Sequence, residues 1–246
     1  MTWITLPLAF LIVATIPAIE APVGTVLPVM LVSRLNATKD KPGKELEGRV
    51  MQEVPLPSGV SIKEGSRIIG HVVNVTENSS GSTSVAVTFD AIQEKDRTTP
   101  VKTGLLALAT MDNVHHAQLP ISANSDRNPV SQWATRQVGG DVVRRGKRKV
   151  ISPHGVTGTW LQGSSVLIKL TPNPDSGCSG GAGYDREQAV WIFSSAACGV
   201  YGLSKVKIAN SGTIPPLGEI VLTSTKKVDI RGGSGWLLIV VAAPSE

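Results

Sequence analysis

The chain has 246 residues, of which 41% are hydrophobic and only 4% aromatic, and its formal net charge is +5. This composition excludes global disorder and leaves aliphatic side chains to fill the core of one large or two small domains. The 25 glycines and 16 prolines favour strands and turns over helices. We therefore predict an all-β fold, with an N-terminal β-barrel or sandwich unit and a second, disulfide-stapled β unit.

Residues 1–21 have the pattern of a secretory signal peptide. No charged residue occurs between Thr2 and Ile19, most of the segment is apolar, and Ala18 and Ala21 provide small residues for cleavage. The usual Lys or Arg near the start is absent, so a misassigned start codon and an uncleaved anchor are the alternatives. Prolines shorten the helix below the roughly 20 residues that a membrane span needs. We expect an exported protein of the periplasm, outer envelope or extracellular space, without a transmembrane helix in the mature chain.

Residues 22–111 form the predicted N-terminal unit. Its strand candidates are residues 25–32, 44–51, 67–75, 85–89 and 100–110. In the second of these, Leu46, Gly48 and Val50 alternate with charged residues, which is the period of a strand with one buried face. Pro28 interrupts the first candidate and predicts an edge strand or a bulge there. Strands at this spacing, joined by turns, suggest an antiparallel barrel or sandwich.

Three motifs of this unit follow one another in a distinctive order. They are Gly24-Thr25-Val26-Leu27-Pro28-Val29, then Lys41-Pro42-Gly43, then Ile62-Lys63-Glu64-Gly65-Ser66-Arg67-Ile68-Ile69-Gly70. Residues 22–110 thereby resemble the β-barrel domain of the VirB/TrbI channel proteins of type IV secretion systems, which implies a Gly-rich barrel in the cell envelope. The preceding segments and the helical antenna of that family have no counterpart here, so only fold and compartment carry over. The whole chain also resembles uncharacterised exported proteins of acidobacterial type, which implies no activity.

Residues 112–150 are predicted to be a polar connector, in which residues 138–143 are a further strand candidate. It ends in a basic run made of Arg144, Arg145, Lys147, Arg148 and Lys149. The rest of the chain is close to charge balance. No aromatic residue is interleaved with the run, so base stacking has no platform and no specific nucleic-acid contact is expected. The run is either a solvated linker or strand edge, or a contact for an anionic polymer or lipid headgroups.

Residues 151–246 form the predicted C-terminal β unit. Its strand candidates are residues 165–170, 189–193, 206–208, 219–223, 228–230 and 236–241, and residues 185–189 hint at a helical turn. Cys178 and Cys198 are the only cysteines. In an oxidising compartment they predict one disulfide, with two free buried thiols as the alternative. The bridge would stabilise the fold by roughly 3 kcal/mol.

Few residues offer catalytic or metal-binding chemistry. Ser179 lies in a glycine-rich loop that superficially resembles that of a serine hydrolase, but no histidine sits in a recognisable companion motif. A hydrolase using Ser179 is therefore an alternative without a base. His115 and His116 would point to opposite faces of a strand, and no third ligand follows at a suitable spacing. We predict no enzyme activity, no cofactor and no metal site, and a polar turn at the two histidines.

The leading hypothesis is an exported structural or interaction protein of the bacterial cell envelope or extracellular matrix, whose partner is itself or an envelope protein or polysaccharide. One version assembles filaments by exchange of the terminal strands. The residues involved would be Val26, Leu27, Val29, Leu31, Trp236 and Leu238. The alternative is that these strands pair within their own chain. A second hypothesis is a polysaccharide- or peptidoglycan-binding module that uses Trp133 and Trp160, since Trp191 and Trp236 are expected in the core.

Overall fold

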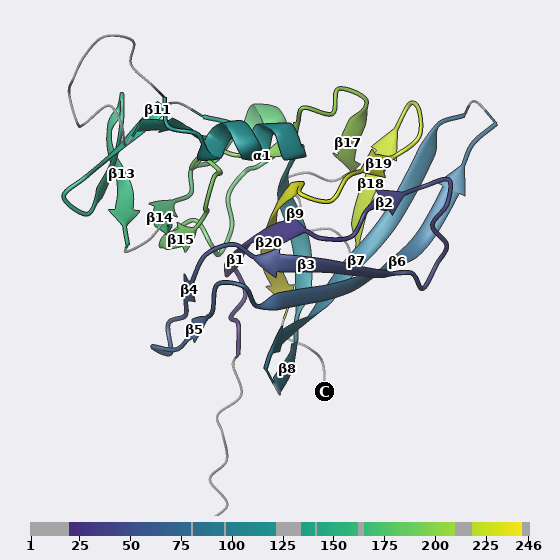
Figure 1. Ribbon diagram of the computed structural model, residues 1–246, viewed down its shortest axis with the longest axis horizontal. Helices are drawn as coiled ribbons and strands as arrows, with labels where there is room; N and C mark the ends of the chain where they lie inside the picture. The colour runs from purple at the N-terminus through teal and green to yellow at the C-terminus, as the bar shows by residue number, and fades with distance from the viewer. Residues whose placement is uncertain are drawn as a thin grey trace, which may run out of the picture.

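The computed structural model describes residues 20–79, 81–95, 97–121, 134–140, 142–161, 165–209 and 218–242. The predicted signal peptide therefore lies almost entirely outside the described residues. The fold is 53% strand and 6% helix, which confirms the predicted all-β class. It consists of one large and one smaller sheet, with two short two-stranded ribbons beside them (Figure 1).

The large sheet has ten strands in the order β16–β9–β20–β1–β3–β6–β7–β18–β17, with β8 paired to β7. Their bounds are β1 (Val26–Leu31), β3 (Glu45–Val50), β6 (Arg67–Glu77), β7 (Thr83–Glu94), β8 (Arg97–Pro100), β9 (Lys102–Ala109), β16 (Gly199–Tyr201), β17 (Val206–Ala209), β18 (Ile220–Ser224) and β20 (Gly235–Ala242). The order starts at β16 and ends at β17 without closing. The predicted barrel is therefore corrected to an open sheet.

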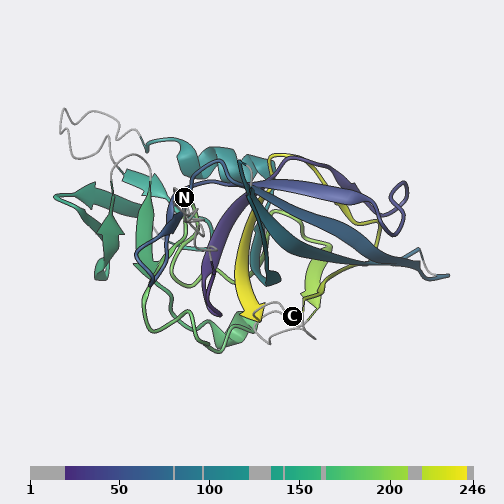
Figure 2. The ribbon, with the colours of Figure 1, turned by 90° about the horizontal axis from the view of Figure 1, so that it is seen from below.

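The large sheet curls around its own core. Phe89 on β7 packs edge-to-face on Trp236 of β20, with ring centroids 5.5 Å apart, although β1, β3 and β6 lie between these strands in the order. Both side chains are fully buried. Figure 2 shows the long strands wrapping around this interior. The contact brings distant parts of one sheet face together, which is how an open sheet makes a core without a second layer.

Sheet membership does not follow the predicted domain boundaries. Four strands of the predicted C-terminal unit, β16, β17, β18 and β20, belong to the same sheet as residues 22–111. β20 pairs with β1 from Val26↔Ile239 to Met30↔Gly235, and β18 pairs with β7. In this sheet order, the segment between β9 and β16 is inserted between strands of one large sheet. Strand order depends on pairing between distant segments, which turn signals do not encode.

Pro28 lies inside the sheet and not at its edge, contrary to the prediction. β1 is flanked by β20 on one side and by β3 on the other. The ladder to β3 begins only at Val29↔Val50, and the Pro28 carbonyl accepts the N–H of Met51. The proline therefore lies at the last bonded position of this ladder, where the chain leaves β3. A proline is tolerated in a central strand here because only one bond, at the end of the pairing, lacks its donor.

The smaller sheet is an antiparallel meander. Its strands are β10 (Ala134–Arg136), β11 (Val142–Gly146), β12 (Lys149–Ser152), β13 (Gly155–Trp160), β14 (Val166–Lys169) and β15 (Glu187–Ala189), in chain order. Most of the predicted connector is therefore folded, and residues 187–189 are a strand where a helical turn was predicted. The remaining short elements are the ribbons β2 (Leu35–Asn36) with β19 (Asp229–Ile230) and β4 (Val54–Pro55) with β5 (Ser61–Ile62), and a 3-10 turn at Pro174–Ser176.

The predicted connector also contains the α-helix α1 (Met111–Gln118). The Thr110 hydroxyl accepts a hydrogen bond from the Asn113 N–H and caps the helix, while Val114 and Ala117 are buried one turn apart. The prediction of a polar turn at the two histidines is therefore wrong. The available signal was Thr110 followed by apolar residues at helical spacing, but eight residues with weak propensity give little periodicity to detect.

A second core joins the two sheets. Val26 on β1 and Leu237 on β20 face it from the large sheet, and Val150 and Ile168 face it from the smaller one. The alternate residues of β1 and β20, such as Leu27 and Trp236, face the first core. Both strands are therefore buried on both faces. This explains why their sequences are continuous apolar runs instead of alternating ones.

Two buried glutamines bond one sheet to the other. Gln52 follows β3 and is 0% exposed. Its Oε1 accepts the N–H groups of Trp191 (2.7 Å) and Val166 (3.3 Å), and its Nε2 donates to the Val166 carbonyl (3.0 Å). Gln188 on β15 accepts the Val26 N–H through its Oε1 at 3.1 Å. These bonds satisfy backbone groups at the starts of β1 and β14 and just after β15, where the ladders between strands end.

The disulfide predicted between Cys178 and Cys198 is present, with the two Cα atoms 6.0 Å apart. It closes a loop of 20 residues next to the smaller sheet. Replacing both cysteines by serine is expected to lower the free energy of unfolding by roughly 3 kcal/mol, because the unfolded chain regains its loop entropy. Urea denaturation measures this loss. Reductant should destabilise the wild type and leave the C178S/C198S variant unchanged; equal sensitivity of the two would contradict the prediction.

Candidate functional site

The basic run forms a tight β-hairpin at the outer side of the smaller sheet. β11 and β12 pair through Arg144↔Ile151 and Gly146↔Lys149. The two turn residues, Lys147 and Arg148, have φ values of 39° and 64°. A two-residue hairpin loop requires positive φ at both central positions, which usually selects Asn and Gly. Here two cations occupy the strained positions, so the sequence keeps positive charge where the backbone favours other residues.

Two valines of the hairpin face the second core, whereas four of its cations are exposed. Val143 and Val150 are buried in the second core, whereas Arg144, Lys149 and the turn are exposed. Arg145 lies on β11, with its backbone opposite Val150. This alternation gives the hairpin one buried face and one solvent-exposed face, and the exposed cations extend into solvent.

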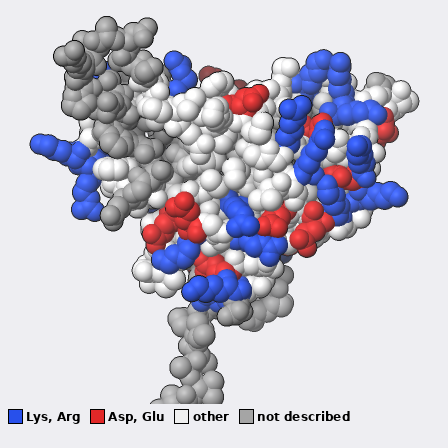
Figure 3. All heavy atoms as spheres, in the orientation of Figure 1, with Lys and Arg blue, Asp and Glu red and all other residues white. Residues whose placement is uncertain are grey.

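Four cations of the hairpin have no acidic partner among the described residues. None of the ion pairs in the described ranges involves Arg144, Lys147, Arg148 or Lys149. Between Val142 and Pro174 the sequence contains no Asp or Glu. In Figure 3 blue side chains project at the left edge, where Figure 1 places β11 and β13. The smaller sheet therefore presents a concentrated cationic tip.

Two aliphatic side chains lie on the same outer face. Ile151 is 39% exposed and Val156 is 60% exposed, and the two residues are direct partners in the pairing of β12 with β13. Arg144 is the partner of Ile151 on the other side. Direct partners in antiparallel strands share a face, so a guanidinium and two aliphatic groups form one row across three strands.

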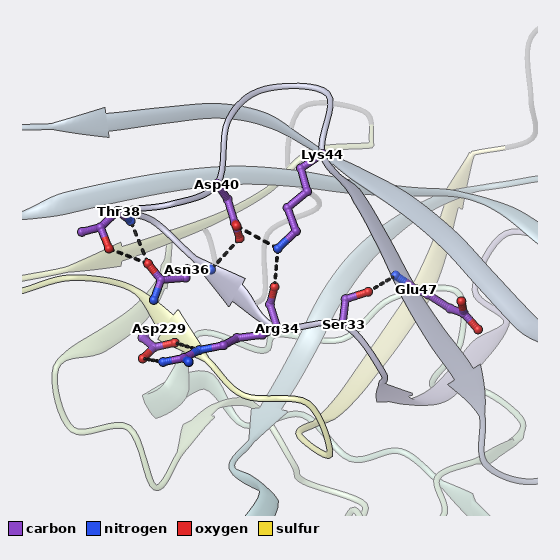
Figure 4. A network of polar contacts seen from close by, with 8 residues as sticks. All are labelled: Ser33, Arg34, Asn36, Thr38, Asp40, Lys44, Glu47 and Asp229. Carbon is purple, nitrogen blue, oxygen red and sulfur yellow. Dashed lines mark hydrogen bonds and ion pairs between the residues drawn. The ribbon is translucent and has the colours of Figure 1, made fainter.

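Charges at the opposite end of the molecule are satisfied internally (Figure 4). The Arg34 Nε donates to Asp229 Oδ1 at 2.8 Å, and this bond lowers the pKa of the Asp229 carboxyl. The Lys44 ammonium donates to the Arg34 carbonyl and to Asp40, which in turn accepts the Asn36 N–H. The network ties β2 to β19 and to the start of β3. Its cations therefore have a structural role, unlike those of the hairpin.

A second group of exposed lysines lies around β17 and β18. Its members are Lys205, Lys207, Lys226 and Lys227. The pKa of Lys205 is lowered because the Lys226 side chain lies within hydrogen-bonding distance of it. These residues carry four positive charges on the other sheet, away from the basic hairpin, and provide a matched comparison for it.

A groove of about 810 Å³ lies between α1 and the segment that follows β10. Its polar lining includes His116, Arg136 and Tyr201. Burial raises the pKa of the Tyr201 phenol, whose oxygen accepts the Cys198 N–H at 3.0 Å. No carboxylate occurs among the described lining residues, so the groove contains no pairing of an acid with a base.

Ser179 is exposed beside the buried, disulfide-bonded Cys178. Within the described part of the chain, no histidine is hydrogen-bonded to it: His71 instead pairs with Asp90, and His115 lies against His116 with ring centroids 6.1 Å apart. The geometry therefore offers Ser179 no base among the described residues. Likewise, the described residues contain no group of three side chains able to hold a metal ion.

Of the tryptophans considered for sugar stacking, Trp191 and Trp236 are buried, as predicted. Trp160 is half-buried against the second core. Trp133 lies outside the described residues. The described part of the chain therefore holds one partly accessible tryptophan of this set and no pair that could clasp a sugar ring.

No protein-family profile, curated protein or solved structure matches this chain. None of the helices in the described ranges has the length and apolar character needed to cross a bilayer. The disulfide fits an oxidising periplasmic or extracellular compartment.

Proposed function

We propose that this chain is a non-enzymatic interaction protein of the bacterial cell envelope or extracellular space, and that it binds an anionic partner through the β11–β12 hairpin. The observation that carries the proposal is the concentration of exposed cations at residues 144 and 147–149 of a β-hairpin, without an acidic partner among the described residues. Charges on a preordered element lose little conformational entropy on binding. They also attract an anionic surface over a distance of about 8 Å at physiological salt.

The proposed interaction does not use exchange of the terminal strands. β1 lies between β20 and β3, and both β1 and β20 face a core on each side. The residues named for exchange, Val26, Leu27, Val29, Leu31, Trp236 and Leu238, are each 0% exposed. Releasing either strand would expose these side chains and break two ladders, so the intrachain pairing favours a self-contained fold.

Neutralising the hairpin is expected to weaken binding to a polyanion. The variant R144Q/K147Q/R148Q/K149Q should elute from immobilised heparin at much lower salt than the wild type, because counterion release scales with the charges in contact. The matched control is K205Q/K207Q/K226Q/K227Q, which removes the same number of charges from the other sheet and should elute close to the wild type. Equal elution of both variants would mean that net charge alone causes retention.

A further inference from the structure

We propose that the anionic partner is a bilayer surface rich in anionic phospholipid, and that Ile151 and Val156 insert into its interface while the cations of the hairpin contact the headgroups. This inference rests on the proposed function. A bilayer interface is the anionic surface that accommodates both halves of the site, since it offers negative charge beside an apolar phase.

The exposed aliphatic pair is the first support. Among the described residues, the other exposed large apolar side chains are Val23, Val32, Val60, Met111 and Leu119. Ile151 and Val156 differ from these because they are direct strand partners and form one continuous apolar surface. Val156, at 60% exposed, is also the most exposed of the set. Single exposed aliphatic residues need no explanation, whereas a paired group beside the exposed cations Arg144 and Lys149 does.

A β-bulge creates this pair. The register of β12 and β13 shifts after Val150↔Gly158, so that Ile151 lies opposite Val156 and Thr157 is left as the extra residue. The Thr157 hydroxyl bonds the Val150 carbonyl at 3.4 Å. Without the shift, the polar Thr157 would lie opposite Ile151. The bulge therefore turns Val156 toward the outer face, and bulges commonly redirect a side chain in this way at functional edges.

The arrangement of charge around the pair is the second support. Arg144 lies beside Ile151 on the adjacent strand, and Lys149 lies two residues before Ile151 on β12. The turn residues Lys147 and Arg148 follow at the end of β12 that is away from the aliphatic pair. Long basic side chains can reach headgroups while their stems lie along apolar surface. An acidic polysaccharide would bind the same cations but would leave the aliphatic pair in water. The combination therefore favours lipid over a soluble polyanion.

The test compares sedimentation of the full chain with vesicles of phosphatidylcholine alone and with vesicles that also contain phosphatidylglycerol. We expect binding to the mixed vesicles only. I151T/V156T should bind them about tenfold more weakly, because two inserted aliphatic groups become polar. Its elution from heparin should not change. The control V32T/V60T removes two exposed aliphatic groups elsewhere and should bind like the wild type.

A gain-of-binding variant guards against a folding artefact. V156W should bind the mixed vesicles more tightly than the wild type, because tryptophan favours the membrane interface. The charge variant R144Q/K147Q/R148Q/K149Q should lose about fivefold per removed charge. If I151T/V156T binds vesicles like the wild type, insertion is wrong. If the wild type binds heparin but no vesicles, the lipid partner is wrong and the proposed function stands. Failure to bind either would overturn both.

Discussion

Replacing Gln52 by leucine is expected to lower the free energy of unfolding by about 2–6 kcal/mol. The substitution nearly conserves side-chain volume, so the loss comes from polar groups and not from a cavity. It removes the acceptor of the Trp191 N–H and of the Val166 N–H, in a place where the Gln52 side chain is 0% exposed. Each buried donor left without a partner costs about 1–3 kcal/mol, since water cannot replace the lost bond.

Replacing Gln188 by leucine provides a comparison in which fewer hydrogen bonds are lost. Among the described residues, its Oε1 accepts from a single donor, the Val26 N–H, and its Nε2 has no hydrogen-bond partner. Leucine at this position removes one useful bond and also one unsatisfied buried group. Q188L should therefore cost less than Q52L when both are measured by urea denaturation. A Q52L variant as stable as the wild type, or a larger loss in Q188L, would show that these bonds do not couple the sheets.

Replacing Trp236 by alanine is expected to cost about 3–5 kcal/mol, the range for deleting a large buried aromatic side chain. Trp236 is 0% exposed and contacts Phe89 across the curled sheet. Its removal would leave a cavity where the two halves of the sheet meet. The loss should appear as a lower urea midpoint.

Replacing Trp236 by phenylalanine separates the contribution of aromatic packing from that of the indole N–H group. The Trp236 Nε1 is buried without a hydrogen-bond partner among the described groups. W236F keeps an aromatic ring against Phe89 and removes this unsatisfied donor, so it should recover most of the stability that W236A loses. A W236F variant as unstable as W236A would mean that the fit of the whole indole, and not apolar burial, stabilises this region.

Local patterns determined the parts of the fold that depend on neighbouring residues. The alternation of Leu46, Gly48 and Val50 predicted β3, where Leu46 and Val50 are buried as expected. Two cysteines in a chain with an apparent export signal predicted the bridge between Cys178 and Cys198, which is present. The all-β class followed from the many turns and short aliphatic runs. These features share one property, which is that each can be read within a short window of sequence.

The sequence predicted the cations of the candidate site but not its aliphatic residues. The basic run was identified in the sequence, but it was placed in a connector. The run of charged residues shows no alternation of apolar and polar positions, and two isolated valines, Val143 and Val150, are too few to reveal a strand. The pairing of Ile151 with Val156 depends on a bulge, and a register shift of one residue leaves no compositional trace. Arg144, Lys149 and the two aliphatic residues were therefore recognised as one surface only when the strands were paired.

The sequence by itself determined the class of fold, the disulfide and the positions of the long strands of the large sheet. Only the tertiary structure decided that β20 pairs with β1, that Pro28 lies in a central strand, and that Gln52 bonds the smaller sheet. The physical reason is that local propensity and periodicity act over a few residues. Strand order and buried polar bonds instead depend on contacts between segments far apart in the chain, whose partners are chosen by the packing of the whole molecule.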